Sequence, residues 1–330
     1  MKGNKGIYLV QAVIIILLLF IGIGSTSASQ SQEPLILKFG HVLAPSHPYH
    51  LGAEKFKEVL EKNAPSPVRV DIFPSSQLGS ERDLTEGLQL GTIQVAIVPG
   101  TIALFEPKQG VFDMPFLFKD NEHAWRVFDG EIGEELAKDL PKKGLRLLSY
   151  WENGFRNITN NIRPINTPED LRGIKIRVPE NKGYLATFEA FGANVVTMSF
   201  GEVYTALQQG TIDAQENPLA IVVSNKIFEV QKYLSVTGHL YCPAQVIMSE
   251  KTWSSMSDEM KNAVMEAANE ARDYERNVLS IQNSEYLEQL KKVMEVNVVE
   301  DVAPFREAAM QVWEEFDDQY GDLIDKIINY

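Results

Sequence analysis

The chain has 330 residues, and its 45 acidic and 31 basic side chains give a formal net charge of −14 at pH 7. A surface this acidic argues against nucleic acid and anionic lipid as partners. The single cysteine, Cys242, cannot form an internal disulfide, so the fold depends on core packing, for which a chain of this length suffices, typically as two domains.

The first residues have the pattern of an export signal. Lys2 and Lys5 precede an apolar run from Ile7 to Ile23, and small residues follow, with Thr26 and Ala28 spaced as at a cleavage site. This pattern predicts a secretory signal peptide that is cut after Ala28. The alternative is an uncleaved membrane anchor, because the apolar run is nearly long enough to span a bilayer. The only cysteine lies far from the cut, so a lipid anchor there is not expected.

The elements predicted for the first half alternate between strands and helices. In chain order they are a strand at 35–41, a helix at 48–62, a strand at 68–73, a helix that begins after Ser80, and a strand at 94–98. Such alternation predicts helices packed on a mainly parallel sheet. Ligands then bind beyond the carboxyl ends of the strands.

The same pattern restarts in the second half. We expect strands at 145–151, 173–178 and 193–196, a short helix after Thr167, a helix at 185–191 and another capped by Ser199. Two α/β units in succession predict two lobes that face each other across a cleft. After a signal peptide at 1–28, we place lobe I at 29–152 plus about 242–280, and lobe II at 153–241 plus about 281–330.

A long amphipathic helix is predicted from Asp258 toward Val293. Its apolar stripe consists of Met260, Val264, Ala267, Ala271, Tyr274, Val278 and Ile281. Acidic residues dominate its polar face, which argues against a membrane role. We expect this helix to pack across both lobes.

A short two-faced strand carries the first candidate binding residue. Between 173 and 179, apolar side chains alternate with Lys175 and Arg177, and Pro179 ends the strand. Arg177 is thus near the carboxyl end of the strand, where an α/β lobe binds its ligand. A guanidinium there offers paired donors in the planar geometry that a carboxylate accepts. Taken alone, an ordinary solvated arginine is the alternative reading.

Several further motifs stand in a fixed order around Arg177. They are Phe73–Glu81, Phe112–Phe116, Asn153–Asn157, Val196–Gln208 and Asp213–Pro218. Together they resemble the extracytoplasmic receptors of tripartite ATP-independent periplasmic (TRAP) transporters, over most of the mature chain. The resemblance implies a two-lobed α/β fold of the periplasmic-binding-protein-like type (class II), with mixed, mainly parallel sheets. It also implies a receptor that is not an enzyme and has no cofactor.

The resemblance implies roles for individual residues as well. Arg177 corresponds to the family's carboxylate clamp, and Arg156 to a second arginine that assists it. Asn217 holds the place of an asparagine that hydrogen-bonds the ligand carboxylate, and Phe200 that of an aromatic residue that lines the cleft. For Phe200, simple packing against the start of a helix is the alternative.

Other positions are weaker candidates. His41 and Glu81 match family positions that face the pocket, and Tyr241 belongs to a stretch similar to that of sugar-acid receptors. His47 and His50 are three residues apart, but two histidines without a third ligand are more often exposed polar residues than a metal site. We therefore expect no bound metal.

The expected ligand is a small organic acid. Sialic-acid receptors of the family carry a glutamate just after the third strand, where this chain has Pro99 and Gly100, which argues against sialic acid. The stretch 237–243 favours a sugar acid, and a hexuronate or related aldonate is the leading expectation. A C4-dicarboxylate or another keto or hydroxy acid is the alternative.

The expected function is delivery of this acid to the membrane subunits of a TRAP transporter, where an ion gradient drives uptake. A purely sensory receptor would use the same fold. A secreted hydrolase is a remote alternative, because the sequence lacks the G-x-S-x-G, H-E-x-x-H, C-x-x-C and G-x-x-x-x-G-K motifs. We expect a periplasmic monomer whose first lobe closes over a carboxylate held by Arg177, Arg156 and Asn217.

Overall fold

The computed structural model of the protein describes residues 33–330, and the predicted signal peptide lies outside this range. Within the range, no helix combines the length and the hydrophobicity that a membrane span needs. The strands are β1 (Leu35–Gly40), β2 (Val68–Phe73), β3 (Val95–Ile97), β4 (Leu145–Asn160), β5 (Lys175–Val178), β6 (Asn194–Thr197), β7 (Ala214–Asn217), β8 (Tyr233–Ser249) and β9 (Glu295–Val298).

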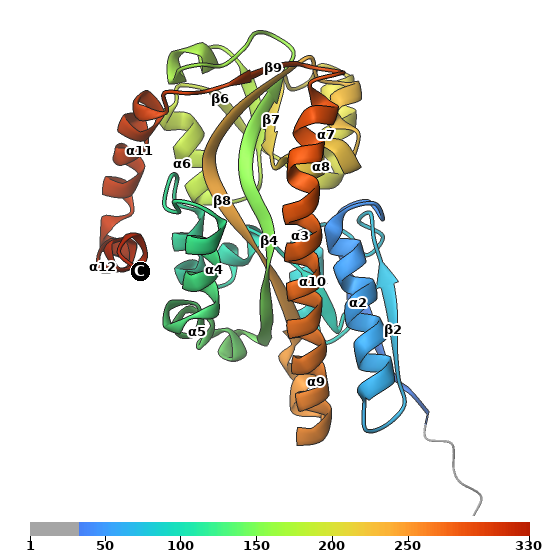
Figure 1. The fold of residues 1–330 in the computed structure, drawn as a ribbon. Helices are drawn as coiled ribbons and strands as arrows, with labels where there is room; N and C mark the ends of the chain where they lie inside the picture. Colours follow the sequence, from blue (N-terminus) through green and yellow to red (C-terminus); the bar gives the residue numbers. More distant parts are fainter. Residues whose placement is uncertain (1–32) are drawn as a thin grey trace, which may run out of the picture. The chain divides into compact units, whose positions relative to one another are not determined.

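Helices connect most of these strands (Figure 1). They are α2 (Pro48–Asn63), α3 (Glu81–Leu90), α4 (Asn121–Asp129), α5 (Glu131–Ala137), α6 (Lys182–Ala190), α7 (Phe200–Gln208), α8 (Leu219–Ser224), α9 (Glu250–Ser254), α10 (Asp258–Leu290), α11 (Ala303–Glu315) and α12 (Asp317–Ile328). Short 3₁₀ helices are η1 (Thr101–Leu104), η2 (Pro107–Asp113), η3 (Leu140–Lys143), η4 (Pro168–Leu171) and η5 (Ile227–Glu229). The predicted strands and helices are all present, and the short helix after Thr167 is of the 3₁₀ type.

The strands of the described residues form one mixed sheet in the order β2-β1-β3-β8-β4-β7-β5-β6, with β9 also paired to β8. The pairs β1/β2, β1/β3, β5/β6 and β5/β7 are parallel, as the β-α-β alternation predicts. Two long antiparallel strands, β4 and β8, join these parallel groups (Figure 1). The mixed α/β fold is therefore confirmed, and its two halves share a single sheet.

Separate apolar cores lie toward the two ends of this sheet. The first core is built on β1, β3, α2 and the first half of α10, with Phe39, Phe56 and Trp151 fully buried in it. A second core surrounds β5 and α6, with Ile176 and Phe188 among its members. Because β4 and β8 run between the two cores, side chains on these strands can contact both of them. The exact lobe boundaries stay a prediction.

The long helix is confirmed, but part of its predicted apolar stripe is wrong. Met260, Val264, Ala267 and Ala271 are buried, whereas Tyr274 is 41% and Ile281 59% exposed. Beyond Ala271 the buried face carries Glu275, Arg276 and Leu279 instead. The predicted stripe repeats every 3.5 residues, and an α-helix turns every 3.6, so the stripe drifts by about 20° per heptad away from the core.

Of the capping boxes predicted at Ser80 and Ser199, the structure contains the one at Ser80. Ser80 and Asp83 form a full capping box at the start of α3. At α7, the Ser199 hydroxyl instead donates a hydrogen bond to the Glu202 carboxylate over 2.8 Å and caps no backbone amide. Both helices nevertheless begin where predicted, because the following apolar residues pack against the cores.

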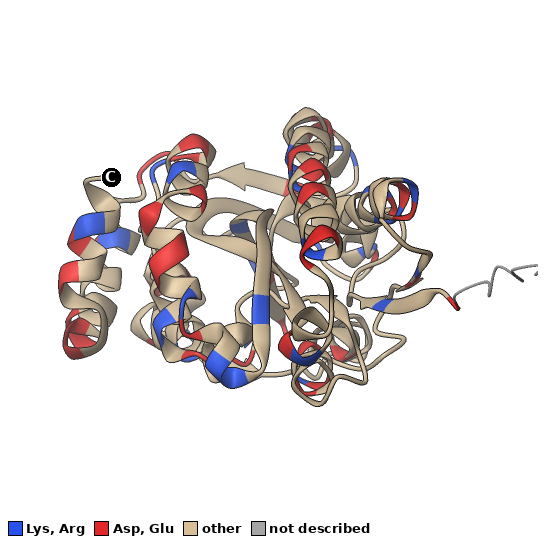
Figure 2. Cartoon of the chain, turned by 90° about the horizontal axis from the view of Figure 1, so that it is seen from below, with Lys and Arg blue, Asp and Glu red and all other residues tan. Residues whose placement is uncertain are grey.

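Acidic side chains lie mainly on the outer helices. Figure 2 shows acidic residues recurring along the helices, and those of α10 and α12 are exposed except for Glu275. The large negative charge of the chain is therefore carried on its exterior, whereas Arg156 and Arg177 are each only 3% exposed. An anionic ligand would meet these two buried cations rather than the acidic exterior.

Candidate ligand-binding site

The sheet order brings the predicted binding motifs together. β7 lies between β4 and β5, so that Asn157 pairs with Asn217 and Arg177 pairs with Gln215. Arg156 on β4, Asn217 at the end of β7 and Arg177 on β5 are consequently neighbours although they are far apart in the sequence. They meet at the carboxyl ends of β5 and β7, where an α/β fold presents its ligand.

An irregularity in β4 precedes this cluster. The pairing with β8 shifts between Glu152 and Gly154, which marks a β-bulge. Gly154 has a φ of 103°, a conformation that residues with a side chain rarely adopt. Bulges turn the strand and redirect the side chains that follow, so this glycine helps to aim Arg156 into the site.

A small cavity lies at the convergence of the strands. Its volume is about 30 Å³, which is enough for about two water molecules. It is lined by Val42, Leu43, Tyr49, Glu81, Pro99, Gly100, Asn153, Arg156, Arg177, Pro179, Tyr184, Phe200, Asn217, Ile221 and Cys242. The lining includes residues of both apolar cores. The cavity therefore lies between the two cores and is enclosed by them.

Arg177 is the buried cation of this cavity that lacks a carboxylate partner. Its Nε and Nη2 both donate to the backbone oxygen of Met198, over 2.9 and 2.6 Å. Its guanidinium lies 6.0 Å from the ring centre of Phe200, and no ion pair joins it to an acidic residue within 33–330. Burial lowers the pKa of Arg177 to about 10, so it stays charged at neutral pH. A buried charge without a counter-ion is unfavourable, which makes this position a candidate site for an anion.

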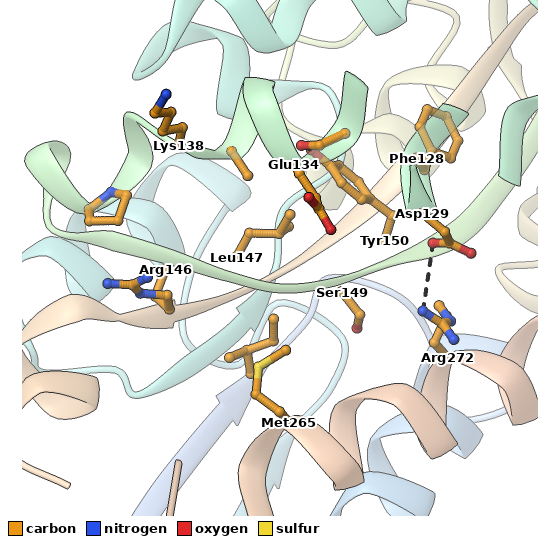
Figure 3. Close-up of a pocket in the computed structure, with 14 residues that line it drawn as sticks. Phe128, Asp129, Glu134, Lys138, Arg146, Leu147, Ser149, Tyr150, Met265 and Arg272 are labelled. Carbon is orange, nitrogen blue, oxygen red and sulfur yellow. Dashed lines mark hydrogen bonds and ion pairs between the residues drawn. The ribbon is translucent and has the colours of Figure 1, made fainter. Parts of the chain in front are cut away.

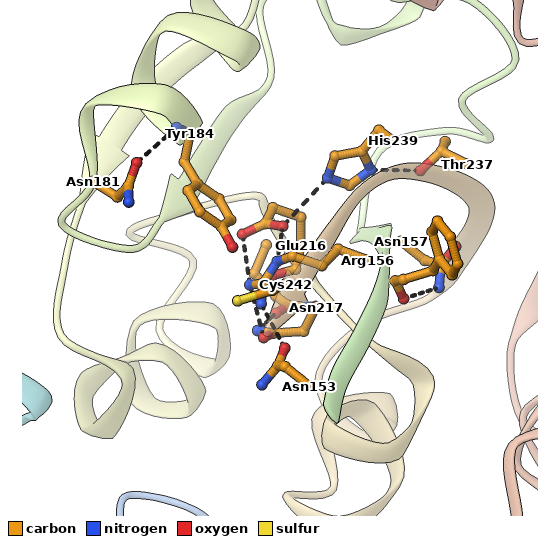
Figure 4. Close-up of polar contacts among 12 residues, drawn as sticks. Asn153, Arg156, Asn157, Asn181, Tyr184, Glu216, Asn217, Thr237, His239 and Cys242 are labelled. Carbon is orange, nitrogen blue, oxygen red and sulfur yellow. Dashed lines mark hydrogen bonds and ion pairs between the residues drawn. The ribbon is translucent and has the colours of Figure 1, made fainter. Parts of the chain in front are cut away.

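Arg156, in contrast, is fully engaged with protein groups (Figure 4). Its Nε and Nη2 bind the two carboxylate oxygens of Glu216 over 2.5 and 2.8 Å. Nη2 also donates to Asn217 Oδ1 over 2.9 Å, and Nη1 donates to Asn153 Oδ1 over 3.0 Å. Arg156 thereby fixes two amide side chains that line the cavity. Its predicted direct contact with the ligand stays a prediction.

Glu216 and His239 complete this network. His239 Nε2 is 3.3 Å from Glu216 Oε2, and its Nδ1 is 2.7 Å from the Thr237 hydroxyl. Burial would raise the pKa of Glu216, but Arg156 and His239 together outweigh burial and hold this pKa below its ordinary value. The charges of Arg156 and Glu216 therefore cancel. Sequence reasoning missed both Glu216 and His239, although Glu216 directly precedes Asn217 in a motif already singled out.

Glu81 faces the arginines from the first core. It begins α3 and lines the cavity. Burial raises the pKa of Glu81 to about 7, with Arg177 opposing this shift. The site thus combines Arg177, a cation without a carboxylate partner, with the ion pair of Arg156 and Glu216, whose charges cancel. It also contains the carboxyl group of Glu81, whose pKa is about 7.

Comparisons with known proteins identify the family of this chain. A model of the DctP family, bacterial extracellular solute-binding protein family 7, matches residues 39–319. The chain belongs to this family. Its members include the solute receptors of TRAP transporters, which are extracytoplasmic binding proteins and not enzymes. The chain is therefore a two-lobed solute receptor, as predicted.

Three relatives show how close the similarity is. The 2,3-diketo-L-gulonate-binding periplasmic protein YiaO of Escherichia coli is 38% identical over 267 residues, which is 81% of each chain. A TRAP periplasmic solute binding protein from Polaromonas sp. JS666, bound to D-erythronate, is 39% identical with a TM-score of 0.87, over 89% of this chain and 98% of that one. The sugar acid binding protein DctPAm of Advenella mimigardefordensis, in complex with galactonate, is 35% identical with a TM-score of 0.86, over 90% and 97% of the two chains.

Two predicted site residues of this receptor lie outside the cavity lining. His41 is buried and its Nε2 is 3.2 Å from His50 Nδ1. Tyr241 packs against an aromatic group that includes Phe118 and Phe155. Side chains alternate along a strand, and since Cys242 faces the cavity, its neighbour Tyr241 points the other way. The other predicted residues, Arg177, Arg156, Asn217, Phe200 and Glu81, all line the cavity.

His47, near the start of α2, caps this helix. His47 Nδ1 accepts a hydrogen bond from the Tyr49 amide over 3.1 Å and so caps the helix. In the described part of the receptor, no group of three or more His, Cys, Asp or Glu side chains could hold a metal ion. Burial lowers the pKa of His41 to about 3, and His50 adds to this effect, so His41 is neutral.

Sequence reasoning also missed the polar residues that join the two cores. The Asn153 amide donates a 2.6 Å hydrogen bond to the Tyr49 hydroxyl, which connects β4 with α2. Asn181 Nδ2 donates to the Gly100 oxygen over 2.8 Å, which connects the start of α6 with the loop after β3. Such contacts depend on three-dimensional proximity, and no local sequence pattern predicts them.

A larger hollow of the receptor lies elsewhere, with a volume of about 460 Å³ (Figure 3). It is bounded by β4, α5 and α10, and two arginines line it. Arg146 is bound to Glu250 over 2.8 Å, and Arg272 lies 3.7 Å from Asp129. Because these charges are already paired, this hollow lacks the uncompensated cation that distinguishes the Arg177 cavity.

Proposed function

We propose that this receptor binds a monocarboxylate of the sugar-acid class, a hexuronate or related aldonate, and delivers it to the membrane subunits of a TRAP transporter. The observation that carries the proposal is the buried guanidinium of Arg177, which is charged and has no carboxylate partner in the described chain. A ligand carboxylate would receive its remaining donors. Asn217, whose Oδ1 accepts a hydrogen bond from Arg156, would add a further hydrogen bond to the ligand.

The charge of the cavity favours one carboxylate over two. Arg156 is neutralised by Glu216, so Arg177 is the one net cation among the lining residues. Glu81 on the facing wall would repel a second carboxylate whenever it is ionised. A C4-dicarboxylate would thus leave its second charge buried and unpaired, which is costly. A sugar acid presents hydroxyl groups instead, which polar lining residues such as Asn153 and Tyr49 can bind.

The named relatives support this ligand class. D-erythronate and galactonate, bound to two of them, and 2,3-diketo-L-gulonate, named for the third, are all monocarboxylates with several oxygen-bearing carbons. We extend this chemistry to the present receptor on the basis of its single uncompensated cation. The same family membership supports a periplasmic location. Export by a signal peptide cleaved after Ala28 and action as a monomer are further parts of the proposal.

Binding requires the cavity to widen. A volume of about 30 Å³ cannot hold a six-carbon acid. The two lobes must therefore separate to admit the ligand and close over it, which excludes water and strengthens the ion pair with Arg177. The closed form would then be the one that the membrane subunits recognise.

Isothermal titration calorimetry with a panel of acids tests the proposal. D-galactonate, D-glucuronate and succinate cover an aldonate, a hexuronate and a C4-dicarboxylate. We expect binding of at least one sugar acid and at least tenfold weaker binding of succinate. Tighter binding of succinate would favour the dicarboxylate alternative, and binding of none of the monocarboxylates would contradict the proposal.

A further inference from the structure

Tyr184 lines the cavity with a hydroxyl group that has no hydrogen-bond partner. Its side chain is completely buried, and its oxygen makes no hydrogen bond among residues 33–330, although Asp113 and Cys242 are its polar neighbours. Figure 4 shows the ring extending from α6 toward Arg156, with the hydroxyl near Cys242. Buried polar groups in native proteins are almost always hydrogen-bonded, so an orphaned hydroxyl in a binding cavity points to a ligand.

The position of Tyr184 is fixed from several sides. Asn181 caps α6, because its Oδ1 accepts hydrogen bonds from the amides of Gly183 and Tyr184 over 2.8 and 3.3 Å. Its Nδ2 donates to Asp113 Oδ2 over 2.7 Å. The Tyr184 ring lies 5.0 Å from the Arg156 guanidinium in a cation–π contact. The hydroxyl is therefore held rigidly, as a group that discriminates between ligands must be.

Arg156 connects Tyr184 with the residues proposed to bind the ligand carboxylate. Arg156 contacts both the Tyr184 ring and Asn217, and Asn217 is a proposed carboxylate ligand. On the other side, a Cβ atom placed on Gly100 would be 3.8 Å from the hydroxyl oxygen. The hydroxyl thus lies between the carboxylate-binding wall and the facing loop.

We propose that the Tyr184 hydroxyl donates a hydrogen bond to the oxygen on the carbon next to the ligand carboxylate. The receptor then selects acids with a hydroxyl, keto or ring oxygen at that carbon. This inference rests on the proposed function, and it specifies the ligand class at the same site. An acid without that oxygen would leave the Tyr184 hydroxyl buried and unpaired, which is the kind of mismatch that sites reject most strongly.

Burial raises the pKa of Tyr184 well above its ordinary value. The phenol is therefore a neutral donor throughout the physiological pH range. Removal of the hydroxyl by Tyr184→Phe keeps the ring, its packing and its contact with Arg156. The variant thus isolates the hydrogen bond from the rest of the side chain.

The test is a cycle of two proteins and two ligands, measured by calorimetry. The proteins are the wild type and Tyr184→Phe, and the ligands are D-galactonate and its 2-deoxy analogue. We expect the wild type to prefer D-galactonate by roughly 10-fold or more, and the variant to reduce that preference to about 2-fold or less. Because the two ligands are compared on the same protein, a general loss of stability does not imitate this result.

Different outcomes overturn different statements. An equal ligand preference in the wild type and Tyr184→Phe overturns the role of Tyr184 and leaves the proposed function standing. Failure of the wild type to bind D-galactonate or any other sugar acid overturns the proposed function, and this inference with it. Tyr150→Phe removes a buried hydroxyl far from the cavity, one that binds Gly133 over 3.2 Å, and it should leave the ligand preference unchanged.

Discussion

Arg82 and Glu180 form an ion pair between the two sides of the candidate site. Nε and Nη2 of Arg82, at the start of α3, lie 3.1 and 3.0 Å from Glu180 Oε2, just beyond β5. Both residues line a small hollow at the edge of the cavity, together with Arg177 and Phe200. The pair therefore connects elements of the first and second cores at the rim of the cavity.

This ion pair should hold the closed form of the receptor with modest strength. Arg82 is 49% and Glu180 38% exposed, and exposed pairs contribute about 0.2 to 1 kcal/mol. Arg82→Ala should therefore raise the Kd for a bound acid by roughly 2- to 5-fold, mainly through faster release measured by stopped-flow fluorescence. The effect should shrink at high salt, since exposed charges are screened.

A matched control exists on β2. Arg69 and Asp71 form an exposed pair at 3.0 Å on a single strand, far from the cavity. Arg69→Ala removes a similar ion pair and should leave the release rate unchanged. Equal effects of the two variants would rule out a specific role of Arg82 in closure.

Loss of Arg177 should be far more damaging than loss of Arg82. Arg177→Ala should weaken binding by about 2 to 5 kcal/mol, as truncation of one partner of a buried charge pair does. Arg177→Lys should also bind poorly, because a point charge replaces a planar fork of donors. Calorimetry measures both effects. Arg172→Ala, which changes an exposed arginine of the same region, is the control, and near-normal affinity in Arg177→Ala would exclude Arg177 as the clamp.

The sequence predicts Arg177 more fully than the rest of the site, for a physical reason. Alternation on a short strand that ends at Pro179 places Arg177 at the carboxyl end of β5 without any knowledge of the remaining fold. The capping box at Ser80 is equally local. The roles of Glu216 and Tyr184 depend on the insertion of β7 between β4 and β5 and on the packing of α6, and neither arrangement follows from a local pattern.

The misplaced residues have equally specific causes. Tyr241 lies one position before Cys242 on β8, so a shift of one residue decides which side chain faces the cavity. Tyr274 and Ile281 continue an apolar repeat, but the tertiary contacts of α10 after Ala271 involve the buried polar pair Glu275 and Arg276. Sequence periodicity alone does not indicate where a helix begins to bury charged groups.

Buried carboxyl groups between β4 and α10 should make stability depend on pH. Glu152 is 3% exposed and accepts a 3.0 Å hydrogen bond from Trp125, while its amide donates to the Glu275 carboxylate over 3.0 Å. Burial raises the pKa of Glu152 from 4.5 to about 7, with Arg276 opposing the shift. Between these two values the folded protein holds a proton that the unfolded chain does not, so this group adds stability below pH 4.5 and loses it as the pH rises through 7.

Glu152→Gln should remove this dependence, because the amide stays neutral and can still accept from Trp125. The free energy of unfolding of the variant, minus that of the wild type, should increase by roughly 2 kcal/mol from pH 5 to pH 8. Urea unfolding at several pH values measures this difference, in which the histidines common to both proteins cancel. Glu189→Gln, at an exposed position, should show no such trend, and a difference that falls with rising pH would contradict the assignment.

Close packing of α2 on β4 should make Gly52 intolerant of a methyl group. A Cβ atom at Gly52 would lie 2.5 Å from the ring of Trp151, which is fully buried. Alanine is favoured over glycine in a helix by about 1 kcal/mol, but overpacking a rigid core costs about 1 to 3 kcal/mol. Steric crowding should therefore prevail, and Gly52→Ala should lower the free energy of unfolding.

Gly321→Ala in α12 provides the opposite case. There the nearest atom to a new Cβ is an Asp317 oxygen at 3.4 Å, an ordinary contact, so helix propensity should dominate and stabilise the protein by up to about 1 kcal/mol. Thermal unfolding of the two variants side by side separates the effects, because each makes the same chemical change within a helix. If both substitutions stabilised the protein, the tight contact between α2 and Trp151 would have to relax at little cost, and the close approach of helix and strand beside the site would not depend on glycine.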